Sequence, residues 1–166
     1  IVGMVGLAAG PIPMMIEYVN TDEFDSILTH NRYTLLDQPA GELITLADAK
    51  GLGIINGAPF SSGLLARPLD ESATYIYRQA EPETIARANR LKEICKRHNV
   101  SIKAAAIQFS TRDPRIHTTI MGASSAQQIR QSADALAVDI PEEIWDEFHN
   151  EVPPKLVDDI KGVHDK

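Results

Sequence analysis

The chain has 166 residues, of which 43% are hydrophobic, a composition that suits one globular domain and is too apolar for a disordered chain. A net charge of −7 argues against nucleic acid or an anionic membrane as the main partner. No apolar run in the sequence reaches the length of a membrane span. The single cysteine excludes an internal disulfide framework and is typical of a reducing compartment, so we expect a cytoplasmic protein.

Strands and helices are predicted in alternation along the chain. The first segment, residues 1–6, is an apolar run bounded by glycine and predicts a buried strand, and residues 7–13 follow as a loop. The later elements follow from the same rules of periodicity, capping and glycine or proline punctuation. They are strands at 25–29, 52–56 and 116–121, helices at 13–19, 35–50, 84–99, 101–110, 125–136 and 141–151, a loop at 57–65, and a loosely held polar tail at 152–166.

This alternation predicts an α/β fold with a parallel sheet and crossover helices. Four βα units fit either a small doubly wound sheet or half of an eight-unit (β/α) barrel, that is, of a TIM barrel. The chain starts at Ile1 inside an apolar run, which favours a piece of a longer protein and therefore the half barrel. We expect residues 1–151 to form this half and its two open sheet edges to pair with the missing half or with a second copy.

Three segments that follow predicted strands are candidates for chemistry. Residues 122–128 run from a strand into a helix, where free N–H groups and the helix dipole favour a phosphate, although Ser125 and Gln128 also form a plain capping box. Residues 58–65 carry two serines and a glycine, which suits either a turn or close approach of a ligand. Residues 30–33 bring polar and aromatic side chains to the carboxyl end of a strand.

Metal and thiol chemistry find little support in the sequence. The five histidines are scattered, and none pairs with a second ligand at metal spacing, so we assign no metal site. Cys95 falls on the apolar face of a predicted helix, where we expect an inert core thiol.

Taken together and in this order, the segments resemble the C-terminal half of the aldo-keto reductases. Within that family they look most like the sugar-oxidising branch, the L-fucose, L-galactose and D-threo-aldose 1-dehydrogenases. The residues that carry the resemblance are Tyr33-Thr34-Leu35-Leu36, Gly53-Ile54-Ile55 with residues 58–65, residues 101–109, and Gly122-Ala123-Ser124-Ser125 with Gln128.

The resemblance implies a nicotinamide cofactor held by residues of this half. In the family the loop after the fifth strand and the end of the sixth hold the nicotinamide, the loop after the seventh wraps the pyrophosphate, and the last loop and helix hold the adenosine. The residues implied at these places are Leu7, Ala8, His30 and Tyr33, then Phe60, Ser61, Gly63 and Leu64, then Gly122, Ser124, Ser125, Gln128 and Ser132.

Departures from the family pattern fall at three of these positions. Ser124 stands where many members have the Arg or Lys that pairs with the 2′-phosphate of NADP, which slightly favours NAD over NADP. His30 stands where the family usually has Gln, and Ser132 where it often has Asn.

The implied activity is oxidation of an aldose at C1 to the lactone, with hydride transfer to the nicotinamide. The family's catalytic Asp, Tyr, Lys and His come from the first four βα units, so no catalytic residue is assigned here and we expect this chain alone to be inactive. Two alternatives stay open: a half barrel that binds nucleotide or assembles without catalysis, and an independent doubly wound domain that binds a phosphorylated ligand.

Overall fold

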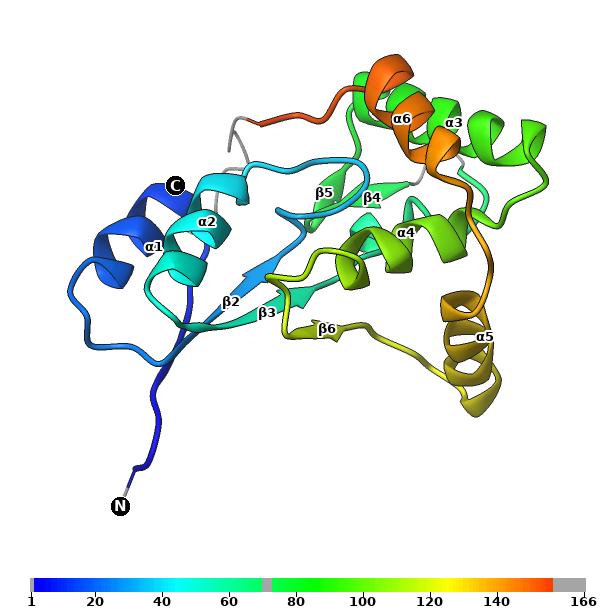
Figure 1. Cartoon of the computed structure of the whole chain (residues 1–166). Helices are drawn as coiled ribbons and strands as arrows, with labels where there is room; N and C mark the ends of the chain where they lie inside the picture. The colour runs from blue at the N-terminus through cyan, green and yellow to red at the C-terminus, as the bar shows by residue number, and fades with distance from the viewer. Residues whose placement is uncertain (1, 70–72, 157–166) are drawn as a thin grey trace.

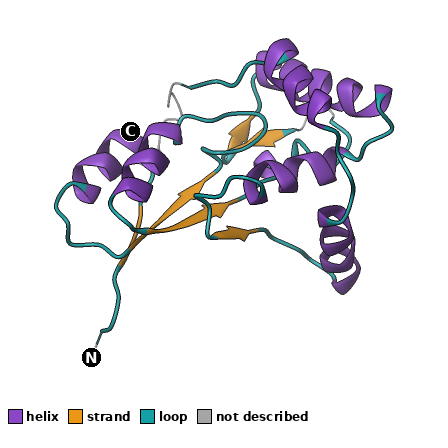
Figure 2. Ribbon diagram, in the orientation of Figure 1, coloured by secondary structure: helices purple, strands orange, loops and turns teal. Residues whose placement is uncertain are grey.

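The computed structural model describes residues 2–69 and 73–156 (Figure 1). Its centre is a four-stranded parallel sheet, covered by helices on one face (Figure 2). The strands are β1 (Gly6–Ala8), β2 (Ser26–His30), β3 (Gly53–Gly57) and β6 (Thr118–Ile120), and a small antiparallel hairpin consists of β4 (Thr74–Tyr75) and β5 (Arg78–Gln79). The helices are α1 (Ile12–Val19), α2 (Gly41–Ala49), the short 3-10 turn η1 (Ser61–Gly63), α3 (Pro82–Arg97), α4 (Ile102–Thr111), α5 (Ala126–Leu136) and α6 (Glu142–Glu151).

The strand order settles which of the two predicted architectures the chain adopts. The order is β1-β2-β3-β6, so each strand of the parallel sheet lies beside the one that precedes it in the chain. A doubly wound sheet reverses its order at a switch point, whereas a (β/α) barrel does not. The structure is therefore half of such a barrel, and within the described residues β1 and β6 each have one edge without a partner strand.

The sheet buries one face and leaves the other accessible. Ile27, Thr29, Ile54 and Asn56 alternate along β2 and β3 on the face toward the helices, and all are fully buried. The residues between them, such as Leu28 and Ile55, are only half-buried on the opposite face, the interior side of a closed barrel.

The first predicted strand is wrong in its position. The structure begins β1 at Gly6, so Leu7 and Ala8 belong to the strand and not to a loop. Residues 2–5 precede it, and Val2 and Met4 are 77% and 73% exposed. The Asp25 N–H donates to the Val5 carbonyl at 2.8 Å, and strand pairing then begins where Gly6 lies opposite Ser26.

The helix predicted at 35–50 is also too long, because α2 begins at Gly41. Before it, the Thr34 hydroxyl accepts hydrogen bonds from the Leu36 and Asp37 N–H groups and holds a turn. Pro39 lacks an N–H and suits the start of a helix better than its interior. The buried leucines that suggested a helix are thus held in a turn.

The remaining helices and strands lie within a few residues of their predicted positions, but the hairpin β4–β5 was missed. The first residues of the tail also differ from expectation. Val152 is 2% exposed, and Lys155 forms a β-bridge with Asp37. The Lys155 carbonyl accepts a hydrogen bond from the Gln38 N–H at 2.8 Å. Residues 152–156 are therefore held against the turn before α2, and residues 157–166 lie outside the described part.

Candidate active site

The carboxyl ends of three strands meet at one edge of the sheet, which we call the carboxyl edge. His30, Gly57 and Ile120 are direct neighbours in the β2–β3 and β3–β6 registers. The loops that follow them therefore start side by side, which brings together His30 and the predicted segments 58–65 and 122–128. Parallel α/β sheets place ligand sites at this edge.

Unusual backbone geometry is concentrated at the carboxyl edge. Ten described residues have φ in the left-handed region, and seven of them lie in the loops after β2 and β3 or in the hairpin. For residues other than glycine such a conformation costs roughly 1–3 kcal/mol, and it is found most often at functional sites. The seven are Asn31, Ala58, Ser61, Ser62, Gly63, Ile76 and Tyr77.

Ser62 connects three segments of this edge, and we call Asn31, Ser62, Arg67, Tyr75 and Ile76 together the Ser62 junction. The Ser62 N–H donates to Asn31 Oδ1 at 3.1 Å, and the Ser62 hydroxyl accepts from the Ile76 N–H at 3.1 Å. The Tyr75 hydroxyl donates to Asp37 Oδ2 at 2.7 Å and lies 3.2 Å from the Asn31 carbonyl oxygen. These bonds fix the hairpin onto the loops that follow β2 and β3.

The loop after β3 was predicted to wrap a pyrophosphate, but the N–H groups of residues 61–64 are already used, and within the described residues 58–66 only the Phe60 N–H has no acceptor. Ser61, Gly63 and Leu64 donate to the carbonyls of Ala58, Phe60 and Ser61 at 3.0, 2.9 and 3.0 Å, and Ser62 to Asn31. Ser61 is buried with its hydroxyl on Thr34, and the Leu64 side chain belongs to the core, whereas Phe60 and Gly63 are half-buried. Among the described residues of this loop, backbone donors for an anion are thus limited to the Phe60 N–H.

The start of α5 combines a cap with free donors. Ser125 Oγ accepts from the Gln128 N–H at 3.3 Å, as the predicted cap requires. The Gln128 side chain reaches back to the Ser124 N–H at 2.8 Å and to its hydroxyl. Within the described residues the N–H groups of Ala126 and Gln127 have no acceptor, so the first turn of α5 presents two donors to solvent.

The other predicted residues are spread more widely. His30 is exposed at the end of β2, and burial, followed by the charge of Arg32, lowers the pKa of its imidazole. The Leu7 side chain is buried in the core cluster that also contains Ile12 and Met15, whereas Ala8 is exposed. Gly122 is exposed after β6, and an added Cβ there meets nothing within 4 Å. Ser132 is half-buried, two turns along α5 from Ser125.

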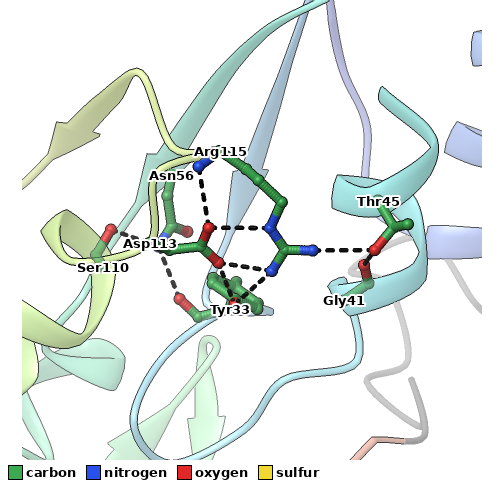
Figure 3. Close-up of polar contacts among 7 residues, drawn as sticks. All are labelled: Tyr33, Gly41, Thr45, Asn56, Ser110, Asp113 and Arg115. Carbon is green, nitrogen blue, oxygen red and sulfur yellow. Dashed lines mark hydrogen bonds and ion pairs between the residues drawn. The ribbon is translucent and has the colours of Figure 1, made fainter. Parts of the chain in front are cut away.

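The structure does not bring Tyr33 together with these residues. Its ring packs on Phe109 of α4, with the ring centroids 5.2 Å apart, in the layer between sheet and helices. Its hydroxyl donates to Asp113 Oδ2 at 2.6 Å and accepts from Arg115 at 3.1 Å (Figure 3). Both partners precede β6, at the end of that strand opposite to Gly122.

Arg115 organises this second cluster, the Asp113 network of Tyr33, Thr45, Asp113 and Arg115. Its guanidinium binds both carboxylate oxygens of Asp113, at 2.9 and 2.6 Å, and donates to Thr45 Oγ1 at 3.0 Å. Hydrogen bonds from Arg115 are the main reason that the pKa of Asp113 falls to about 2. Burial, followed by the bond to Asp113, raises the pKa of Tyr33 to about 12, so Tyr33 is neutral at physiological pH.

A pocket of about 460 Å³ lies beside the Asp113 network, not at the carboxyl edge. Tyr33, Phe109 and Trp145 line it, together with two arginines. Arg112 is bonded to both oxygens of Glu142 and lies over the Trp145 ring, and Arg115 is bonded to Asp113. Both arginines are thus already paired with carboxylates of the described part of the chain, and neither is free to bind an anionic ligand in the pocket.

Among the described residues no group of three His, Cys, Asp or Glu side chains is arranged to hold a metal ion. The same part of the chain contains no helix that is both long and apolar enough to cross a membrane. Cys95 is buried as predicted, and burial raises the pKa of its thiol to about 12, which keeps it protonated and unreactive.

The sequence analysis missed several residues of the carboxyl edge. Asn31 and Ser62 stand in segments that were selected, but their mutual bond joins positions 31 residues apart and has no local signal. Tyr75 and Ile76 belong to the missed hairpin, whose turn residues Ile76 and Tyr77 are not the usual Asn-Gly type.

The profile of the aldo/keto reductase family matches residues 1–150, and the chain belongs to that family. It is 33% identical over 147 residues to a pyridoxal 4-dehydrogenase of Microbacterium luteolum, covering 88% of this chain and 43% of that protein. It is 32% identical over 150 residues to a D-threo-aldose 1-dehydrogenase of a Pseudomonas species, covering 89% and 46%. The chain thus spans less than half the length of these relatives.

Solved structures of the same fold agree with the half barrel. An aldo-keto reductase from Bacillus halodurans matches in its apo form with a TM-score of 0.72 and in its holo form with 0.73, each at 20% identity. The matches cover 92% and 93% of this chain but 52% and 51% of the neighbour. They confirm the predicted (β/α) barrel fold and the prediction that this chain corresponds to about half of such a barrel.

Proposed function

We propose that this chain is the cofactor-binding half of an NAD(P)-dependent oxidoreductase that oxidises an aldose at C1. The observation that carries the proposal is the carboxyl edge, where loops from three neighbouring strands meet and strained backbone gathers. Family membership and the relatives, a D-threo-aldose 1-dehydrogenase and an L-galactose dehydrogenase of Arabidopsis thaliana among them, support the reaction class.

The start of α5 is the proposed seat of the adenosine end of the cofactor. The N–H groups of Ala126 and Gln127, which have no acceptor among the described residues, can donate hydrogen bonds to the ribose hydroxyls of the adenosine. Ser124 supplies no positive charge, and its N–H and hydroxyl are both bonded to Gln128. A 2′-phosphate would therefore find no cation on Ser124, so we propose NAD as the slightly preferred cofactor.

When bound, the nicotinamide accepts a hydride from the sugar carbon. This chain's part is to orient it: His30 and Ala8 stand at the ends of neighbouring strands, and the loop after β3 stands beside them. Among the described residues we assign no general acid or base, because Tyr33, whose pKa is raised to about 12, is bonded to Asp113 away from this edge. The groups that move the proton are proposed to lie in the missing half.

Titration of the purified chain with NADH and NADPH, followed by calorimetry and by nicotinamide fluorescence, tests the proposal. We expect saturable, weak binding of NADH and no tighter binding of NADPH. An Ala126→Pro variant removes one free N–H at a position where a helix tolerates proline and should weaken binding, whereas Glu142→Pro at the start of α6 is the matched control. Absence of saturable binding of either dinucleotide would refute the proposal.

A further inference from the structure

The parallel sheet ends in two strands whose outer edges are open. Within the described residues β1 pairs only with β2, and β6 pairs only with β3. Helices α1 and α5 stand near the opposite ends of this sheet (Figure 1). An open strand edge is a template for pairing with another strand unless the fold covers it. A partner that covers both edges must therefore bring two strand edges of its own.

Helix α5 carries an apolar stripe that the described part of the chain leaves uncovered. The helix packs on α4 and buries only Ala135, whose carbonyl accepts a hydrogen bond from Gln108 of α4 at 2.9 Å. Ile129 and Leu136 stand two turns apart on one face and are 55% and 48% exposed. Ile120, the last residue of β6, is 48% exposed. Apolar side chains are thus exposed both on this edge strand and on the helix that follows it.

The other end of the sheet exposes apolar surface in the same way. Val5, directly before β1, is 45% exposed. On α1, Met14 and Tyr18 stand one turn apart and are 40% and 44% exposed, although the opposite side of this helix is buried in the core. Gly6 and Ala8 of β1 are exposed as well. Both edges of the sheet are therefore bordered by a helix with uncovered apolar side chains.

A second copy of this chain fits both edges at once. The four strands are parallel and stand in chain order, so a half turn about the barrel axis keeps their direction and places β6 of one copy beside β1 of the other. The same rotation places β1 of the first copy beside β6 of the second, so the assembly is closed. Four strands from each copy make eight, the number at which side chains fill the interior of a barrel.

We propose that two copies of this chain close an eight-stranded barrel, in which the β1–α1 end of each copy contacts the β6–α5 end of the other. Leu28 and Ile55, half-buried on the open inner face of the sheet, then become interior residues. The exposed apolar side chains of α5 lie against α1 of the partner copy. The inference goes beyond the proposed function, because it assigns a partner and a contact surface that require no cofactor.

Sedimentation equilibrium of the purified chain tests this assembly and should give twice the chain mass of 18.2 kDa. Met14→Lys and Ile129→Glu each place a charge on one side of the contact and should weaken dimerisation at least tenfold. Tyr77→Asp, a comparable change of an exposed apolar residue on the hairpin, is the matched control and should stay dimeric.

An equimolar mixture of Met14→Lys and Ile129→Glu should form dimers again. In the mixed dimer one of the two contacts has its original side chains, and the other brings the new lysine against the new glutamate. Restoration by mixing requires that unlike ends of the sheet meet, so it distinguishes the closed barrel from a contact between two α1 or two α5 surfaces. Both substituted side chains are exposed in the single chain, and unchanged circular dichroism spectra exclude loss of folding as the cause.

Four results would overturn the inference. The first is a monomer at every concentration, and the second is a species larger than the dimer, because the unlike edges would then fail to close. The third is a dimer that survives both substitutions, and the fourth is a pair of variants that mixing does not restore. A monomer that binds the other four βα units of the D-threo-aldose 1-dehydrogenase, added as a separate polypeptide, would identify that half as the occupant instead of a second copy.

Discussion

The Asp113 network and the Ser62 junction are both clusters of polar side chains, yet they differ in how fully their groups are paired. In the Asp113 network each carboxylate oxygen accepts two bonds, and the guanidinium and the tyrosine hydroxyl are paired as well. In the Ser62 junction the backbone is strained, and Arg67 and the Ser62 hydroxyl keep donors to spare. Complete pairing stabilises a fold, whereas strain and spare donors are features of binding sites.

The largest effect on stability is expected from breaking the Asp113 network. Asp113→Ala leaves Arg115 and the Tyr33 hydroxyl without their shared acceptor in a region where the Asp113 side chain is 11% exposed. Unpaired partners of this kind cost about 2–3 kcal/mol of unfolding free energy. Urea denaturation of the variant beside the unsubstituted chain measures this difference.

Glu142→Ala is the matched control, since it removes an exposed carboxylate from Arg112 and should cost well under 1 kcal/mol. NADH affinity should be unchanged in Asp113→Ala under conditions where the variant is folded. A loss of affinity there would mean that the two clusters are coupled, and the comparison would fail.

The pH dependence of stability sharpens the same comparison. The pKa of Asp113 in the folded chain is about 2, below its unfolded value, mainly because Arg115 hydrogen-bonds the carboxylate. The contribution of the ionised Asp113 carboxylate to the free energy of unfolding is therefore complete above about pH 4 and is lost as the pH falls toward 2. Asp113→Asn should be less stable than the unsubstituted chain at pH 7, and the gap should narrow from pH 4 to 2.

The contribution of Tyr33 to stability depends on pH in the opposite direction, because it is lost as the pH rises. Burial and the bond to Asp113 raise the pKa of Tyr33 to about 12, so its contribution is present below about pH 10 and is lost as the pH rises toward 12. Thermal unfolding of Tyr33→Phe across this range should show a flatter profile than that of the unsubstituted chain. Parallel profiles for the two proteins would contradict the assignment of Tyr33 to the network.

Local patterns predicted most of the fold but not the parts set by long-range contacts. Alternating apolar runs and glycine stops predicted β2, β3, β6 and the main helices, because burial of one face leaves a periodic signature. The turn before α2 was missed because Leu35 and Leu36 are buried without being helical, held by the Thr34 hydroxyl. The first strand was displaced because its pairing partners on β2 lie twenty residues later and leave no local signal in residues 1–8.

In the candidate site, too, features set by local pattern were predicted, and those set by long-range contacts were not. The Ser125 cap was predicted because its partner lies three residues away, and the structure has that bond. The placement of Tyr33 was not predictable from local pattern, since its partners Asp113 and Arg115 lie about eighty residues on. The contact of the Arg67 guanidinium with the Ser62 carbonyl was not predicted, because it depends on the shape of the loop and not on any motif.

The smallest expected effect on stability comes from a change in the hairpin turn. Unlike the preceding substitutions, this change is expected to raise the free energy of unfolding. Ile76 and Tyr77 form the two-residue turn with φ of 48° and 65°, a conformation that Asn and Gly adopt readily and a β-branched residue does not. The double variant Ile76→Asn, Tyr77→Gly should keep the Ile76 N–H bond to Ser62 and stabilise the chain by about 1 kcal/mol. Tyr77 is 80% exposed, so its replacement loses little packing, and the half-buried Ile76 loses only part of its contacts. If the strained turn serves binding, the same variant should bind NADH less well while melting at a higher temperature. The control is Asn99→Gly, which places glycine at a left-handed φ of 53° after α3 and should leave NADH affinity unchanged. A double variant that melts lower than the unsubstituted chain would show that the turn is held by contacts of the two side chains, and the contrast between a paired cluster and a strained one would no longer hold for the hairpin.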